Sequence, residues 1–262
     1  MSEADLLGPG IEGKKVFFLY PPSVIQNEMV LEIVKNEYAV YLLHDHTKIF
    51  RLMALYPDSI LFINLDEGLK EVEWEALIRE MNTSSETQGV RVGILTYNNS
   101  PELAQKYLMD LSVSCGFIKL SLGLKQSTEI LLKALEANEA RGRRRFLRVK
   151  CPDRSATFNL RHKDKQLSGQ IVDISSVGMS CFFDAEVIIP VRTRFDDIQL
   201  KLRGVLAKVS AVVFGTRHLE SGKTLFVLLF DLGQLPDAKQ KIRVFIQQSL
   251  QSSLDAEIKT LP

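Results

Sequence analysis

The segment Lys14–Tyr20 reads KKVFFLY, an apolar run rich in aromatic residues, and a helix-like pattern follows it from Val24 to about Glu37. A short buried strand followed by an amphipathic helix is the opening of an α/β fold. The same order repeats through the first half of the chain. The further expected strands are Tyr38–Leu43, Ser59–Leu65, Val90–Tyr97 and Gly116–Leu120.

Helical patterns separate these strands. One continues through Leu55, one surrounds Trp74–Met81, and a third begins at Ser100, an N-cap residue followed by proline at the first helical position. A long last helix is expected from about Gln126 to Ala140. Five strands with five helices predict a five-stranded, doubly wound parallel sheet.

Beyond residue 140 the apolar residues recur every second position, and Gly or Pro interrupts the pattern about every ten residues. This pattern predicts a six-stranded antiparallel β-barrel, closed by a C-terminal helix from about Pro236 to Ser252. The expected strands lie near 155–161, 167–174, 178–183, 197–202, 204–214 and 224–231.

Charge changes at the same boundary. The formal net charge of the 262 residues is +1, but residues 1–140 carry 12 basic and 20 acidic side chains, net −8, and residues 141–262 carry 21 and 12, net +9. We therefore expect two domains, 1–140 and 141–262, the second beginning with an arginine-rich hinge at 141–150.

Composition excludes several classes of protein. With 45% hydrophobic and 25% charged residues, the chain is expected to form packed cores. No apolar stretch approaches the roughly 18 residues of a membrane span, and the first ten residues lack a basic signal-peptide region. Three cysteines without a CxxC pair predict neither disulfides nor a zinc site. A cytoplasmic protein without membrane insertion is expected.

Two motifs stand out in the second half. Arg141–Arg148 contains five arginines in eight residues, and Asp173–Gly178, reading DISSVG, follows an apolar strand. Alone, the first is typical of a solvated linker or a nucleic-acid-binding arm, and the second of an ordinary β-turn.

Together, Arg144-x-x-x-Arg148 and Asp173-x-Ser175-x-x-Gly178 on a six-stranded barrel resemble the PilZ domain, over roughly residues 141–252. PilZ domains are receptors for the bacterial second messenger cyclic di-GMP. The resemblance implies that the RxxxR hinge and the DxSxxG strand and turn bind this ligand, with no other cofactor.

The residue chemistry agrees with that implication. The guanidinium groups of Arg143, Arg144 and Arg148 can bind phosphate oxygens or the O6/N7 edge of guanine. Asp173 offers an acceptor for guanine N–H groups, Ser175 a small hydroxyl, and Gly178 a close backbone approach. Arg145 lies inside the spacer of the RxxxR motif and is not counted among the expected contacts.

The first half looks like a receiver domain of two-component signalling that cannot be phosphorylated. Tyr20-Pro21-Pro22 replaces the acidic pair that would hold a metal ion. Ile63 or Asn64 falls at the phosphoacceptor position, and Asp66 comes slightly late. Thr96 and Lys119 match receiver positions, but without the acids they cannot form a phosphotransfer site.

Three further patterns are expected to be structural. Gly222-Lys223-Thr224 lacks the first glycine of a phosphate-binding loop and predicts a hairpin turn. His44-Asp45-His46 is more typical of a surface loop than of a metal site, and Cys151 and Cys181 are expected to be small core residues. No catalytic arrangement is found, so no enzymatic activity is expected.

The leading hypothesis is a cyclic di-GMP receptor in which ligand binding at the hinge changes the arrangement of the two domains and so controls a protein partner. The alternative is a ligand-independent PilZ-like interaction module. A phosphorylated regulator and a DNA- or RNA-binding protein are weaker hypotheses, and no nucleic-acid partner is expected.

Overall fold

The structure is a computed structural model that describes residues 13–142, 145–152, 155–163, 165–231 and 236–261. These residues form two compact units. The first comprises the described residues up to Arg145 together with those from Leu250 onward, and the second is Phe146–Ser249. The first unit is therefore discontinuous in sequence.

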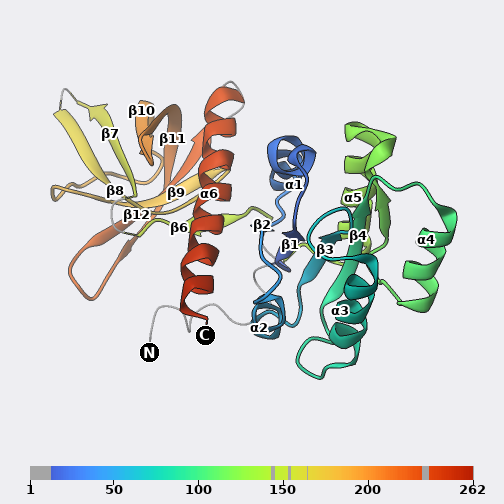
Figure 1. Ribbon diagram of the computed structural model, residues 1–262. Coiled ribbons are helices and arrows are strands. Elements are labelled where there is room, and N and C mark those ends of the chain that lie inside the picture. The colour runs from blue at the N-terminus through green and yellow to red at the C-terminus, as the bar shows by residue number, and fades with distance from the viewer. Residues whose placement is uncertain (1–12, 143–144, 153–154, 164, 232–235, 262) are drawn as a thin grey trace. The chain divides into compact units, whose positions relative to one another are not determined.

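A five-stranded parallel sheet forms the centre of the first unit (Figure 1). The spatial order of its strands is β2-β1-β3-β4-β5. The chain therefore places β2 on one side of β1 and the later strands on the other side, as in doubly wound folds. The strands are β1 (Val16–Leu19), β2 (Val40–Leu43), β3 (Ile60–Asn64), β4 (Arg91–Thr96) and β5 (Phe117–Lys119).

Helices connect these strands. They are α1 (Val30–Lys35), which follows a π-helical turn at Ile25–Met29, α2 (Ile49–Leu55), α3 (Glu71–Thr83), α4 (Pro101–Gln105), which continues as a π-helical turn at Lys106–Asp110, and α5 (Leu124–Ala137), which follows a 3-10 turn at Leu120–Leu122. The Ser100 hydroxyl accepts a hydrogen bond from the N–H of Leu103 and caps α4, as the sequence predicts.

The two faces of the sheet bury different residues, because successive side chains of a strand point to opposite sides. Phe17 and Ile63 face a core that includes Leu52 of α2 and the fully buried Trp74 of α3. The even-numbered residues of β1 and β3 point the other way, where the rings of Phe18 and Phe62 stack 5.2 Å apart. The sheet is covered on both faces, as expected for an α/β domain.

The second unit is an antiparallel barrel. Its strands are β6 (Arg148–Lys150), β7 (Ala156–His162), β8 (Lys165–Ser175), β9 (Gly178–Phe183), β10 (Arg194–Leu202), β11 (Val205–His218) and β12 (Thr224–Asp231). Their order is β6-β8-β7-β10-β11-β12-β9, and a further β8–β9 pairing closes six of them into a ring, with β6 added beside β8.

Alternation of side chains fills this barrel. The side chains of Leu200 in β10, Val209 in β11 and Leu228 in β12 are fully buried or nearly so. On each of these strands the residues next to the buried one point outward. The last helix, α6, runs from Pro236 to Thr260, past the expected end near Ser252. No helix of the described residues is long and apolar enough to cross a membrane.

The expected fold class is confirmed: a five-stranded parallel α/β sheet and a six-stranded antiparallel barrel with a C-terminal helix. The expected hairpin turn is also confirmed, because Gly222, with φ of 80°, lies in the turn between β11 and β12. The short strand β6, inside the arginine-rich segment, was not expected.

Candidate ligand-binding site of the barrel

Strand β6 places one end of the arginine-rich segment beside the DxSxxG segment. It pairs antiparallel with the end of β8, so that Arg148 lies opposite Ser175 and Lys150 lies opposite Asp173. Two segments separated by 25 residues in sequence are thus brought to adjacent strands. This pairing joins Arg148, Asp173 and Ser175, three of the residues that the sequence predicts for the site.

Arg148 and Asp173 form an ion pair on these two strands. Nη1 of Arg148 lies 3.4 Å from Oδ1 of Asp173, and the side chains are 43% and 21% exposed. Oδ1 is buried, yet it has no hydrogen-bond partner among the described residues, so its contact with the guanidinium is electrostatic only. One carboxylate oxygen thus retains an unused acceptor position beside a half-exposed arginine.

The other oxygen of Asp173 is fixed by a residue that the sequence prediction missed. The hydroxyl of Ser180, on β9, donates a hydrogen bond of 2.6 Å to Oδ2 of Asp173. The two residues face each other because β8 and β9 form a hairpin about the turn Ser176–Val177. Counting outward from a two-residue turn in DISSVGMS would have indicated Ser180 as the partner of Asp173.

Ser175 and Gly178 close the same hairpin. The Ser175 side chain is buried and donates to the carbonyl of Gly178 over 3.2 Å. A Cβ atom built on Gly178 would lie 2.4 Å from the carbonyl oxygen of Leu228 in β12, so strand packing already demands glycine at this position. Both residues therefore have a structural role in the turn.

The remaining arginines of the segment are less informative. Arg143 and Arg144 lie outside the described residues. Arg145 is exposed in the segment that precedes β6. Arg141 lies in the first unit, where its guanidinium carbon is 5.2 Å from the centre of the Tyr38 ring.

The carboxyl edge of the parallel sheet, where a receiver would be phosphorylated, is occupied by other contacts. Asn64 ends β3 and donates from its side-chain amide to the carbonyl of Tyr20. Asp66 accepts hydrogen bonds from the Thr96 hydroxyl, 2.6 Å from Oδ1, and from the Tyr97 N–H, 2.8 Å from Oδ2. Both oxygens of Asp66 thus hold β4 to the loop after β3.

Other candidate groups have ordinary partners. Nδ1 of His46 lies 2.7 Å from the Tyr20 hydroxyl, and Lys119 donates to the carbonyl of Asn99. In the described part of the chain, no group of three or more His, Cys, Asp or Glu side chains is placed to hold a metal ion. Burial raises the pKa of Cys115 and of Cys151 to about 12, so both thiols remain protonated at neutral pH.

Comparison with known proteins found no matching family model and no matching curated protein. Among solved structures, the chain is similar to the PilZ domain of YcgR from Escherichia coli with c-di-GMP, at 17% identity and a TM-score of 0.37, covering 45% of this chain and 99% of that one.

Two other solved structures are similar over about the same share of this chain. The MrkH–c-di-GMP complex of K. pneumonia matches at 20% identity and a TM-score of 0.38, covering 45% of this chain and 56% of that one. The inhibitor of motility MotI of Bacillus subtilis matches at 13% identity and a TM-score of 0.34, covering 45% and 55%. The chain thus spans about half the length of these two relatives.

Proposed function

We propose that the chain is a receptor for cyclic di-GMP, which binds on the barrel at the β6–β8 pair. The observation that carries the proposal is the register of these strands, which places Arg148 of the RxxxR motif beside Asp173 and Ser175 of the DxSxxG motif. A cyclic dinucleotide offers two phosphates and two guanine bases. Arginine and aspartate side chains complement both kinds of group.

In this proposal Arg148 and Asp173 exchange partners when ligand binds. Their 3.4 Å ion pair leaves Oδ1 of Asp173 buried and without a hydrogen bond. The N–H groups of a guanine edge would donate to this oxygen and so satisfy a buried acceptor. Arg148, released from Asp173, would then bind a phosphate or the O6/N7 edge of the base. Arg143 and Arg144 are proposed to supply the further guanidinium contacts.

Ser175 and Gly178 are proposed to act through the shape of the turn. The hydroxyl of Ser175 is committed to the Gly178 carbonyl, and the missing side chain of Gly178 leaves room for Leu228. These two residues would hold the end of β8 in the position that presents Asp173 to the ligand. Their place in the motif is thereby explained without a direct contact.

Calorimetric titration of cyclic di-GMP into the full chain tests the proposal. We expect binding to the wild type, and a loss of affinity of at least about tenfold for Arg144→Ala, Arg148→Ala and Asp173→Ala, because each removes a charged contact. Arg217→Ala is the matched control, since Arg217 is exposed on β11, which pairs with neither β6 nor β8. No detectable heat and no thermal stabilisation of the wild type would favour the ligand-independent interaction module instead.

We further propose that ligand binding orders the hinge at 141–150 and so changes the arrangement of the two expected domains, 1–140 and 141–262, which controls a protein partner. Support comes from the sequence position of the RxxxR motif, which lies in the hinge itself. Small-angle scattering with and without cyclic di-GMP is the measurement. Superimposable curves would contradict the rearrangement while leaving ligand binding intact.

The first domain is proposed to take part without phosphorylation, and the chain to have no enzymatic activity. Asn64 stands at the end of β3, and the carboxylate of Asp66 is engaged by Thr96 and Tyr97. The proposal includes cytoplasmic localisation and no DNA or RNA partner. Salt-dependent binding to random DNA and RNA tests the second point, because a nucleic-acid arm would bind both and lose affinity as salt rises.

A further inference from the structure

The end of α6 belongs to the first unit and is packed firmly there. Leu254 is buried in the core that contains Phe17 and Trp74, and Leu250 and Ile258 pack against the same core. The helix is therefore a fixed wall beside the parallel sheet. Space left between this wall and the sheet is a preformed feature of the unit.

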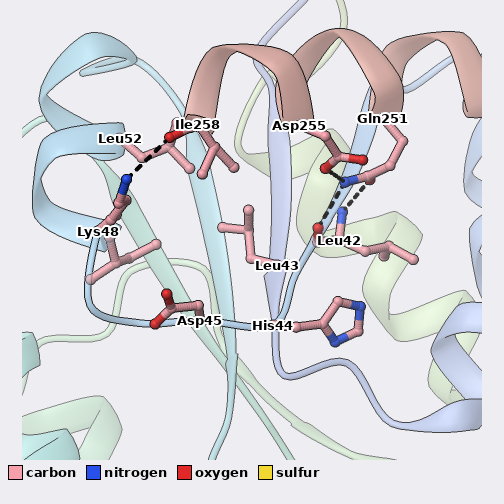
Figure 2. A pocket seen from close by; sticks show the side chains of 10 residues that line it. Leu42, Leu43, His44, Asp45, Lys48, Leu52, Gln251, Asp255 and Ile258 are labelled. Carbon is pink, nitrogen blue, oxygen red and sulfur yellow. Dashed lines mark hydrogen bonds between the residues drawn. The ribbon is translucent and has the colours of Figure 1, made fainter. Parts of the chain in front are cut away.

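Gln251 fastens the wall to the edge strand β2. Its Oε1 accepts a hydrogen bond of 2.8 Å from the Leu42 N–H, and its Nε2 donates one of 2.9 Å to the Leu42 carbonyl (Figure 2). The side-chain amide thus pairs with Leu42 as the peptide group of a neighbouring strand would. The edge of the sheet is sealed at this point, and the groups that form the seal are not available to a ligand.

A hollow of about 400 Å³ lies between the end of α6 and the segment that leads from β2 into α2. Its floor is apolar, because Leu43, Ile49 and Leu52 are buried. Ile258 of α6 adds a partly buried side chain, and Figure 2 shows charged side chains around this apolar centre. An apolar hollow with a few polar groups at its rim is typical of small-molecule sites.

Two carboxylates stand at the rim, on either side of the apolar floor (Figure 2). Oδ1 of Asp255 accepts a hydrogen bond of 2.9 Å from Nε2 of Gln251, and the described residues give Oδ2 of Asp255 no partner. Asp45 accepts hydrogen bonds from the N–H and the hydroxyl of Thr47, which hold the pKa of its carboxyl below the ordinary value. Two negative charges thus flank the hollow, and each retains acceptor capacity.

The lysine of the lining is already engaged. Nζ of Lys48 donates to the carbonyl of Leu261 at 2.7 Å and to the carbonyl of Ile258 at 3.4 Å. These carbonyls lie at the C-terminal end of α6, where the helix dipole favours a positive charge. Lys48 therefore offsets the end of the helix, and the two carboxylates set the charge preference of the hollow. Charge complementarity favours a cation over an anion.

We propose that the hollow is a binding site for a small amphipathic amine, whose apolar body lies on Leu43 and Leu52 and whose ammonium group donates to Asp255. A primary amine is protonated at neutral pH and offers three donors, and Oδ2 of Asp255 is an acceptor with no partner in the described structure. A ligand seated there would contact both α6 and the segment after β2, and would so stabilise the first unit. All lining residues belong to that unit, so the inference is independent of the cyclic di-GMP site proposed on the barrel.

The test uses three probes that share a benzene ring and differ in charge: 2-phenylethylamine, 2-phenylethanol and phenylacetate. Each is titrated into the full chain labelled with ¹⁵N, and the dissociation constant is obtained from the NMR shifts of the amides in 42–48 and 251–258. For the amine we expect a dissociation constant on the order of 1 mM, because so small a ligand has few contact atoms. The alcohol should bind about threefold and the acetate about tenfold more weakly, since the two carboxylates attract only the cation.

A charge variant tests the role of the carboxylate. Asp255→Asn keeps the size of the side chain and an acceptor for Gln251 but removes the charge. It should weaken binding of the amine about threefold and leave binding of 2-phenylethanol unchanged. Asp110→Asn is the matched control, because Asp110 is exposed in the same unit and does not line the hollow.

Several outcomes would overturn the proposal. Equal affinities for the three probes would show an unselective apolar hollow. An Asp255→Asn protein that binds the amine like the wild type would show that the carboxylate is not recognised. Amine-induced shifts confined to amides outside 42–48 and 251–258, or no shift at an amine concentration about twentyfold above the expected dissociation constant, would show that the hollow is not the site.

Discussion

Ser180 holds Asp173 in one orientation, because its hydroxyl donates a 2.6 Å hydrogen bond to Oδ2 and leaves Oδ1 toward Arg148. The two residues lie opposite each other on β8 and β9, on either side of the turn that the DxSxxG motif forms. A neutral side chain outside the motif thus positions the carboxylate on which the proposed ligand contact depends.

Replacement of Ser180 should therefore weaken ligand binding. Ser180→Ala is expected to lower the affinity for cyclic di-GMP by roughly three- to tenfold, since a lost hydrogen bond typically costs about 0.5–1.5 kcal/mol. Calorimetry measures the change. Ser180→Thr, which keeps the hydroxyl, should restore part of the affinity; if both variants bind like the wild type, Ser180 has no positioning role.

Gly178 should matter for stability before it matters for binding. In Gly178→Ala the new Cβ would meet the Leu228 carbonyl at 2.4 Å, so the β9–β12 pair must shift. We expect the free energy of unfolding in urea to fall by about 1–3 kcal/mol. Gly215→Ala on β11 is the control, because a Cβ there has nothing within 4 Å; equal losses in the two variants would contradict the packing argument.

Asp66 is predicted to be a structural residue. Asp66→Ala leaves the buried Thr96 hydroxyl and the Tyr97 N–H without their acceptor and should destabilise the first unit by about 1–3 kcal/mol. The exposed Asp110, replaced by alanine, serves for comparison in the same unfolding measurement. Incubation with acetyl phosphate and Mg²⁺ should not phosphorylate the wild-type protein. Phosphorylation of the wild type that is lost in Asp66→Asn would refute the prediction.

The cysteine thiols should resist alkylation in the folded protein. The pKa of Cys115 and of Cys151 is raised to about 12 by burial, so the reactive thiolate is scarce at pH 8, which lies below both the raised value and that of an unfolded thiol. Iodoacetamide at pH 8 should react more than about a hundredfold faster in urea than in buffer, as mass spectrometry can follow. Similar rates in the two solutions would show that the folded thiols are accessible.

Local patterns were enough to predict most of the fold. The apolar run in KKVFFLY and the alternation in the barrel segments identified strands that the structure contains, because a strand inside a parallel sheet is buried on both faces and a barrel strand on one. Strand β6 was missed because arginine and lysine dominate it: only Val149 is buried, and a three-residue strand has almost no period to detect. The length of α6 was underestimated, because past Ser252 only Leu254 is buried, in the core of the first unit, and the other residues of the helix there are partly or fully exposed, so they show no apolar period.

For the candidate site, the motifs predicted Arg148, Asp173 and Ser175, which the structure brings together. The separate duties of these residues could not be predicted. The approach of the Leu228 carbonyl to Gly178 depends on β12, a strand about fifty residues away in sequence. A sequence motif marks these positions, but it does not show whether a ligand or a neighbouring strand requires the residue there.

The discontinuity of the first unit has a consequence for how the protein is made. Leu254 is a core residue of that unit, yet it is translated after every barrel strand, so this core is complete only after the whole barrel has been synthesised. A nascent or truncated polypeptide that ends after the barrel would have its α/β sheet in place but an unsealed edge. Completion of the first unit therefore has to wait until the second unit has been synthesised.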